Sequence, residues 1–87
     1  MSEYQAISIN YSNYLKSLLN KEITVDLKDA GLRLRGMLKA FDNSSNLLLA
    51  NAVEFEKSPE GNFLEMAKRG NCLIRGDNIH GIFPLEK

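Results

Sequence analysis

Cysteine, tryptophan and histidine are scarce in this 87-residue sequence, which holds one Cys, no Trp and one His. A single cysteine, Cys72, excludes an intrachain disulfide, and a small domain without a disulfide suits a reducing compartment. His80 has no partnered nucleophile and no metal-ligand spacing around it in the sequence. We therefore expect an intracellular protein that is not an enzyme and that holds no metal or cofactor.

Long apolar runs and a net charge are also missing. No stretch approaches the ~20 apolar residues that cross a bilayer, and the N-terminus has no basic region followed by an apolar run. We expect neither export nor membrane insertion, and a nuclear or cytoplasmic location if the source is eukaryotic. Eleven basic and eleven acidic side chains cancel, which excludes the broad positive field of many nucleic-acid binders. Any RNA binding must therefore be local.

The residues that are present are those of an ordered protein. Hydrophobic residues make up 44% of the chain and charged residues 25%, which is typical of a globular domain. A chain of this length buries only about 60–65% of its unfolded surface, so it has material for one core. We predict a single domain over residues 1–87.

Apolar spacing near the N-terminus is helical. Tyr11, Tyr14 and three leucines repeat at helical intervals between residues 11 and 20, with Asn10 or Ser12 available as the N-cap and Asn20 near the end. The spacing predicts one short amphipathic helix over about 11–20.

The remaining chain alternates with the period of β-strands. Polar or Gly- and Pro-containing segments separate the alternating runs at 29–31, 43–46, 57–62 and 75–77. The pattern predicts five strands, at 22–28, 32–42, 47–56, 63–74 and 78–83, with Pro84 closing the last.

Gly36 lies inside the second predicted strand, where a glycine usually marks a sharp bend or a close backbone approach. We predict a mostly β fold, in which an N-terminal helix precedes a strongly bent five-stranded antiparallel sheet that forms a small open barrel. Such a sheet cannot cover both of its edges internally, so its outer strands invite pairing with another chain. Self-association follows, and head-to-tail contacts favour a closed ring.

Two segments resemble a known family. Residues 36–46 read GMLKAFDNSSN and continue into an apolar strand with an acidic end, and residues 74–79 read IRGDNI. Together they resemble the two halves of the signature of the Sm-like (LSm) family, over nearly the whole chain from about residue 16 to residue 84. The resemblance implies the Sm fold, rings of six or seven subunits that are homomeric or heteromeric, and binding of uridine-rich single-stranded RNA.

Four polar-loop residues form the candidate RNA site that the resemblance implies. They are Asn46, Arg75, Gly76 and Asp77, with Ser44 as a weaker contact. An Asn amide carries a donor and an acceptor, which matches the edge of uracil. A guanidinium can stack on a base and neutralise a phosphate. A curved sheet that brings both loops to one rim therefore predicts a small polar pocket.

A structural interpretation of the same residues is open. Asn46 can simply cap a turn, and Arg75 can pair with Asp77 across a tight loop in which Gly76 has a positive φ. Asp42 is expected to fix its loop through backbone amides. Family members often carry an aromatic residue, His or Met in the two positions before the Asn, where this chain has Ser44 and Ser45, so one stacking face is missing.

Three functions compete on this pattern. The first is a ring subunit that binds RNA in RNA processing, splicing or decay. The second is a structural ring subunit that assembles by edge-strand pairing and binds little RNA of its own, which Ser44 and Ser45 favour. The third, an unrelated small barrel that binds peptides, is disfavoured by the IRGDNI segment.

Overall fold

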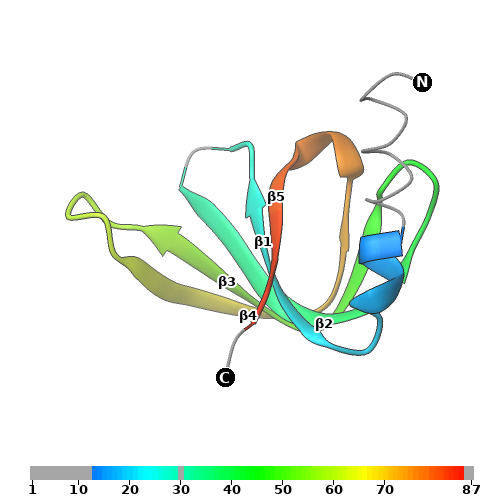
Figure 1. Cartoon of the computed structure of the whole chain (residues 1–87). Helices are drawn as coiled ribbons and strands as arrows, with labels where there is room; N and C mark the ends of the chain where they lie inside the picture. Colours follow the sequence, from blue (N-terminus) through cyan, green and yellow to red (C-terminus); the bar gives the residue numbers. More distant parts are fainter. Residues whose placement is uncertain (1–12, 30, 86–87) are drawn as a thin grey trace, which may run out of the picture.

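The computed structural model describes residues 13–29 and 31–85 as a short helix followed by one five-stranded antiparallel sheet (Figure 1). This confirms the predicted fold class. The strands are β1 (Glu22–Leu27), β2 (Leu32–Phe41), β3 (Leu47–Lys57), β4 (Phe63–Ile74) and β5 (Ile79–Pro84), and a 3-10 turn, η1 (Gly76–Asn78), precedes β5. No helix among the described residues is long and apolar enough to cross a membrane.

The N-terminal helix is described from residue 13, and residues 13–17 are helical. Leu15 and Leu18 are buried in the core, as their helical spacing predicts. The helix ends at residue 17, before the predicted end at residue 20, and residues 18–20 form a turn. Asn20 closes this turn with a left-handed φ of 64°, a conformation that Asn tolerates. Tyr11 and the two candidate N-caps, Asn10 and Ser12, lie outside the described residues.

The strand boundaries agree with the predictions to within one residue, and those of β4 agree at both ends. Only β5 differs at both ends, since it runs from Ile79 to Pro84 rather than from residue 78 to residue 83. Asn78 is the last residue of η1, because its N–H donates to the carbonyl of Arg75 (3.0 Å) and closes the turn. Pro84 is the last strand residue rather than the residue after the strand, and proline is tolerated there because the strand ends.

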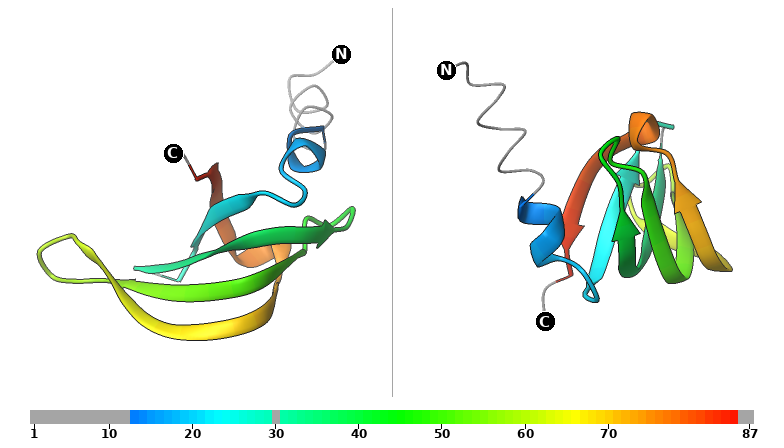
Figure 2. Two further views of the ribbon diagram at one scale, coloured as in Figure 1. Left: turned by 90° about the horizontal axis from the view of Figure 1, so that it is seen from below. Right: turned by 90° about the vertical axis from the view of Figure 1, so that its right-hand side faces the viewer.

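Neighbours in the sheet follow the order β4-β3-β2-β1-β5. The strands β4 and β5 are therefore its two edges, and they do not pair with each other in the described chain. The views in Figure 2 show the sheet curling strongly, with the helix on the side of β1. The β3–β4 hairpin extends away from the helix at the far end of the molecule (Figure 1).

The curvature has a local cause at Gly36. A Cβ on Gly36 would lie 2.9 Å from the carbonyl oxygen of Ala50 and 3.1 Å from the Cα of Ala52. The β2–β3 register shifts between Arg35 and Met37 at the same place, and such irregularities bend a strand. The predicted close approach and bend are both confirmed.

One apolar core fills the concave side of the sheet and the space under the helix. Alternate residues of β1, β2 and the first part of β3 point into it, as the period of two predicts. β4 and β5 each contribute one buried residue, Ile74 and Ile82. The buried members of the core are Leu15, Leu18, Ile23, Val25, Leu34, Leu38, Leu47, Leu49, Ala52, Ile74 and Ile82. Arg33, Arg35, Phe55 and Phe83 lie at alternate positions, on the outer face.

Candidate RNA-binding site

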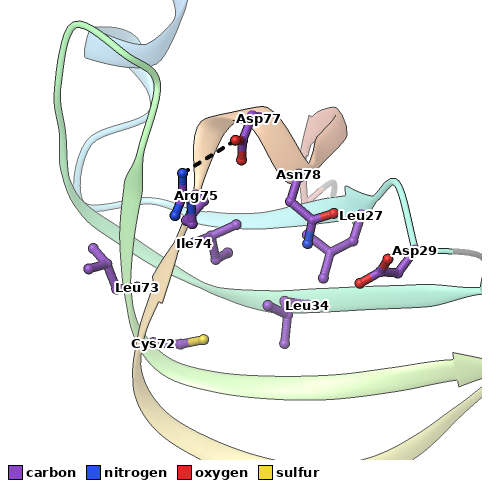
Figure 3. A pocket seen from close by; sticks show the side chains of 9 residues that line it. All are labelled: Leu27, Asp29, Leu34, Cys72, Leu73, Ile74, Arg75, Asp77 and Asn78. Atoms are coloured by element: carbon purple, nitrogen blue, oxygen red, sulfur yellow. Dashed lines mark hydrogen bonds and ion pairs between the residues drawn. The ribbon is translucent and has the colours of Figure 1, made fainter.

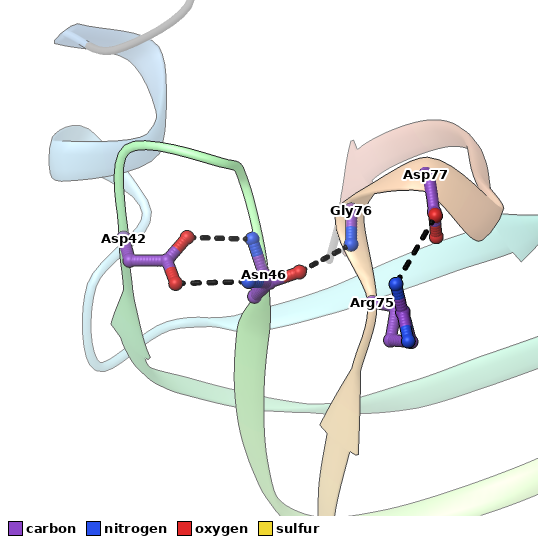
Figure 4. A network of polar contacts seen from close by, with 5 residues as sticks. All are labelled: Asp42, Asn46, Arg75, Gly76 and Asp77. Carbon is purple, nitrogen blue, oxygen red and sulfur yellow. Dashed lines mark hydrogen bonds and ion pairs between the residues drawn. The ribbon is translucent and has the colours of Figure 1, made fainter.

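The register between β3 and β4 brings the two signature loops together. Leu47 pairs with Ile74, so the residue before β3 and the residues after β4 must lie side by side. Asn46 is the first of these, and Arg75 and Gly76 are the others. The oxygen Oδ1 of Asn46 accepts a hydrogen bond from the N–H of Gly76 at 2.7 Å (Figure 4). The structure thus brings the predicted residues to one rim.

Asp42 organises the first loop. Its Oδ1 accepts hydrogen bonds from the N–H groups of Ser44 (2.9 Å) and Asn46 (3.0 Å). Its Oδ2 accepts a hydrogen bond from Nδ2 of Asn46 at 2.9 Å. This confirms that Asp42 fixes its loop through backbone amides, as the sequence predicted.

The amide of Asn46 is therefore already engaged on both of its atoms. Nδ2 donates to Asp42 and Oδ1 accepts from Gly76. An amide has two N–H donors and two acceptor lone pairs, so one donor and one acceptor are left for a ligand. Asn46 thus joins its own loop to the loop after β4, and the two hydrogen bonds fix the orientation of its amide.

Position 76 requires glycine because of a close backbone contact and not, as the sequence predicted, because of a positive φ. The glycines with positive φ are Gly31, Gly61 and Gly70, so the positive φ expected at Gly76 is wrong. A Cβ at Gly76 would overlap the carbonyl oxygen of Ser44 and lie 2.9 Å from the carbonyl carbon of Ser45. The residue must be glycine because the two loop backbones touch.

Arg75 is held loosely. Its Nη2 lies 3.4 Å from Oδ2 of Asp77, and the two side chains are 80% and 72% exposed. An ion pair this exposed contributes little, because water and salt screen it. The predicted pairing of Arg75 with Asp77 is present, and the guanidinium can leave it for a phosphate or a base at small cost.

Beside the loops lies an open cavity of about 600 Å³ (Figure 3). Its polar side carries Arg75 and Asp77, whereas neither Asn46 nor Ser44 lines it. The remaining lining residues are Leu27, Asp29, Leu34, Cys72, Leu73, Ile74 and Asn78. The sequence analysis missed Leu73, which is 74% exposed. The sequence feature that could have identified Leu73 is an apolar residue at an outward-facing position of an edge strand.

The side chains in the part of the chain that the structure describes form no metal centre. No group of three or more His, Cys, Asp or Glu side chains is close enough there to hold a metal ion. Cys72 packs against the core, and Glu54 pairs with Arg69 through Oε1 and Nη2 at 2.7 Å.

The pKa of Asp42 supplies a test of this loop. The hydrogen bond from the side chain of Asn46, followed by that from its backbone N–H, holds the pKa of Asp42 below its ordinary value. A lowered pKa stabilises the folded loop above the ordinary pKa of about 3.9, and this stabilisation is lost as the pH falls through the lowered value. In an NMR titration, we expect the amide signals of Ser44 and Asn46 to shift together with a midpoint below about 3.9. A midpoint at or above it would contradict the bonding around Asp42.

Comparison with known proteins places this geometry in a family. Residues 13–83 match the model of the LSM domain. A putative snRNP Sm-like protein of Pyrococcus furiosus is 39% identical over 69 residues, which are 79% of this chain and 83% of the relative. A heptameric archaeal Sm protein superposes with a TM-score of 0.70 at 35% identity, covering 85% of this chain and 98% of the other. The Pyrococcus abyssii Sm protein in complex with a uridine heptamer has a TM-score of 0.70 at 30% identity, covering 85% and 96%. With both signature loops meeting at one rim, the chain belongs to the LSM domain family of Sm-like proteins.

Proposed function

We propose that this chain is a single-domain subunit, over residues 1–87, of a ring that binds uridine-rich single-stranded RNA. Asn46, Arg75, Gly76 and Asp77 form the binding set, with Ser44 as a weaker contact. The observation that carries the proposal is the hydrogen bond from Gly76 to Asn46, which joins the two signature loops into one polar unit. The similar Sm protein in complex with a uridine heptamer supports the same ligand.

Each group has a chemical task in this proposal. The remaining N–H and lone pair of the Asn46 amide suit a uracil edge, which presents carbonyl oxygens beside N3–H. The exposed guanidinium of Arg75 stacks on the base or pairs with a phosphate. Asp77, on the same turn, steers the guanidinium. Because these charged groups act only at the loop site, a chain with no net charge can still bind RNA there.

Ring formation is supported by the two edge strands, β4 and β5, each of which has one side without a partner strand within the described residues. Leu73 on β4 and Phe83 on β5 are 74% and 48% exposed, and both lie on the outer face, since their neighbours Leu48 and Thr24 alternate with buried residues. When β4 of one subunit pairs with β5 of the next, these two side chains share a face and cover each other. Two different edges give a head-to-tail contact, which closes a ring. The similarity to a heptameric archaeal Sm protein favours such a ring.

The cellular task that fits this chemistry is RNA processing, splicing or decay, performed as a ribonucleoprotein component rather than as an enzyme. Neighbouring subunits are copies of this chain or other Sm-like chains. In a eukaryotic source, the ring works in the nucleus or cytoplasm.

Binding of oligo-uridine by the purified chain tests the proposal. We expect Asn46→Ala to weaken binding at least about tenfold and to destabilise the fold by about 1 kcal/mol, because the N–H of Gly76 loses its acceptor. Arg75→Ala should weaken binding similarly while changing stability by less than about 0.5 kcal/mol, because the residue is exposed. Fluorescence anisotropy with labelled oligo-uridine, beside urea unfolding, separates the two effects.

One observation favours a second candidate function, that of a structural ring subunit. Ser44 and Ser45 offer no ring to stack on a base, which favours a subunit that completes the ring structurally while its neighbours bind RNA. If native mass spectrometry reveals a closed ring that does not bind oligo-uridine, or if both variants bind as well as the wild type, this structural function replaces the direct one.

A further inference from the structure

The outer face of the sheet carries a second cavity, of about 300 Å³, on the side opposite the core. Cross-strand pairing builds it, because Thr24 pairs with Arg35 and Arg33 pairs with Phe55. Its lining residues come from β1 to β4 and from the residue after β5, and they are Thr24, Arg33, Arg35, Phe55, Phe63 and Leu85. We call this cavity the outer cleft. None of these residues belongs to the loop site.

Two guanidinium groups lie over aromatic rings in the outer cleft. The Cζ of Arg33 lies 3.8 Å from the ring centre of Phe63, and the Cζ of Arg35 lies 4.9 Å from that of Phe55. A cation over a ring face is attracted by the ring quadrupole. The stacking restrains both arginines before any ligand arrives, which reduces the ordering cost of binding.

The two arginines differ in charge compensation. Arg33 donates Nε and Nη2 to the carboxylate of Asp26 at 2.5 and 3.1 Å, so its charge is neutralised locally. Arg35 has no ion pair and no side-chain hydrogen bond to any residue within 13–29 and 31–85. It therefore presents an uncompensated cation with five N–H donors. Its natural complement is a phosphate, which a guanidinium binds through two parallel hydrogen bonds.

We propose that the outer cleft is a second contact site for single-stranded RNA, in which Arg35 holds a backbone phosphate. The neighbouring base lies against the stacked guanidinium and ring groups of Arg33, Phe55 and Phe63. Interleaved arginines and aromatic rings are the combination that binds single strands without reading their sequence.

An extended peptide fits the outer cleft less well. Peptides commonly bind a sheet by adding a strand to its edge, but both arginines of the outer cleft lie on β2, an interior strand with a neighbour on each side. A ligand that reaches these arginines must therefore be recognised through side chains. Stacking and phosphate pairing do this, whereas the backbone of a peptide finds no partner there.

The outer cleft lies apart from the loop site. Arg35 lies on β2 seven residues before Asp42, which follows the strand, and seven residues of extended strand span at most roughly 23 Å. All nucleotides of a uridine heptamer are bound when it occupies the loops of a ring. A longer RNA has further nucleotides that can reach the outer face. The outer cleft should therefore matter for long RNA only, and it does so whether or not the loop site reads uracil.

Binding of a uridine heptamer and of a much longer oligo-uridine by the full-length chain tests this proposal. We expect Arg35→Gln to weaken binding of the long RNA by roughly three- to tenfold and to leave the heptamer unchanged. The slope of log affinity against log salt concentration should fall by about 0.7 for each phosphate that the protein no longer neutralises. Lys39→Gln is the matched control, since it removes the same charge from the same strand outside the outer cleft, and it should do neither.

Photo-cross-linking of 4-thiouridine RNA, mapped by mass spectrometry, keeps the two sites distinguishable. Loss of the cross-links at Phe55 and Phe63 in Arg35→Gln, with those at the loops kept, supports the outer cleft. Asn46→Ala should lose the cross-links at the loops and keep those at Phe55 and Phe63. If Asn46→Ala kept the loop cross-links, that result would count against the loop site alone. An unchanged long-RNA affinity in Arg35→Gln, or an equal loss in Lys39→Gln, overturns the proposal. So does an acidic peptide that binds the wild type but not Arg35→Gln while RNA binding is unaffected.

Discussion

Replacing Gly76 by alanine is expected to lower the free energy of unfolding by about 1–3 kcal/mol and to remove most of the oligo-uridine binding. The added methyl group overlaps the carbonyl oxygen of Ser44, and both partners are main chain, so no side chain can rotate away. Overpacking of this kind costs energy through backbone shifts. The shift separates the two loops and breaks the hydrogen bond from Gly76 to Asn46. Urea unfolding and anisotropy, each at one subunit concentration, measure the two effects.

Gly61→Ala is the control for this substitution. Gly61 has a φ of +94°, and a Cβ there would meet nothing within 4 Å. The change therefore strains the backbone at the tip of the β3–β4 hairpin without any clash, and it should cost stability while leaving RNA affinity intact. If Gly76→Ala bound RNA as well as Gly61→Ala does, the contact between the loops would not matter for binding.

The double variant Leu73→Glu with Phe83→Glu is expected to dissociate the ring. Each interface between subunits then has two fewer apolar side chains and two more negative charges on one face of the joined sheet. A loss on the order of 2 kcal/mol per interface weakens each interface by roughly 30-fold. Because every interface in a ring carries the change, native mass spectrometry should detect monomers at concentrations where the wild type stays closed.

Leu64→Glu with Met66→Glu is the matched control for ring formation. Both residues lie on β4 and are 54% and 55% exposed, much like the pair above. However, β4 has 12 residues and β5 has 6, so a neighbouring β5 covers at most half of β4. We place that half next to the loop site, and the control should keep the ring. A ring that dissociates only in the control would move the interface to the hairpin end.

The fold was predictable because its signals are local. The alternation of Ile23, Val25, Leu34 and Leu38 specifies which face of each strand is buried, and Gly36 marks the bend. The boundary at Asn78 was missed because a turn-closing hydrogen bond to Arg75, rather than the apolar pattern, decides where β5 begins. Sequence periodicity does not carry that information.

The proximity of the candidate site residues was predictable, but their bonding was not. The two signature segments flank β3 and β4, and the pairing of Leu47 with Ile74 brings them together. The reason for Gly76 was wrong, because a close approach between two loops depends on tertiary packing that no single segment encodes. The outer cleft was missed for the same reason, since Arg33 and Phe63 meet only across strands.

Gly76 packs against the main chain of Ser44 and Ser45, and none of the nearest atoms belongs to a serine side chain. This contact, the joint between the two loops, therefore depends on the backbone path at positions 44 and 45 and not on the side chains there. Ser45, at a φ of 61°, demands a residue that accepts this backbone shape, and β-branched types do so poorly. Within that limit, the two positions can exchange side chains freely, so ligand preference can diverge among related subunits while the joint itself stays unaltered.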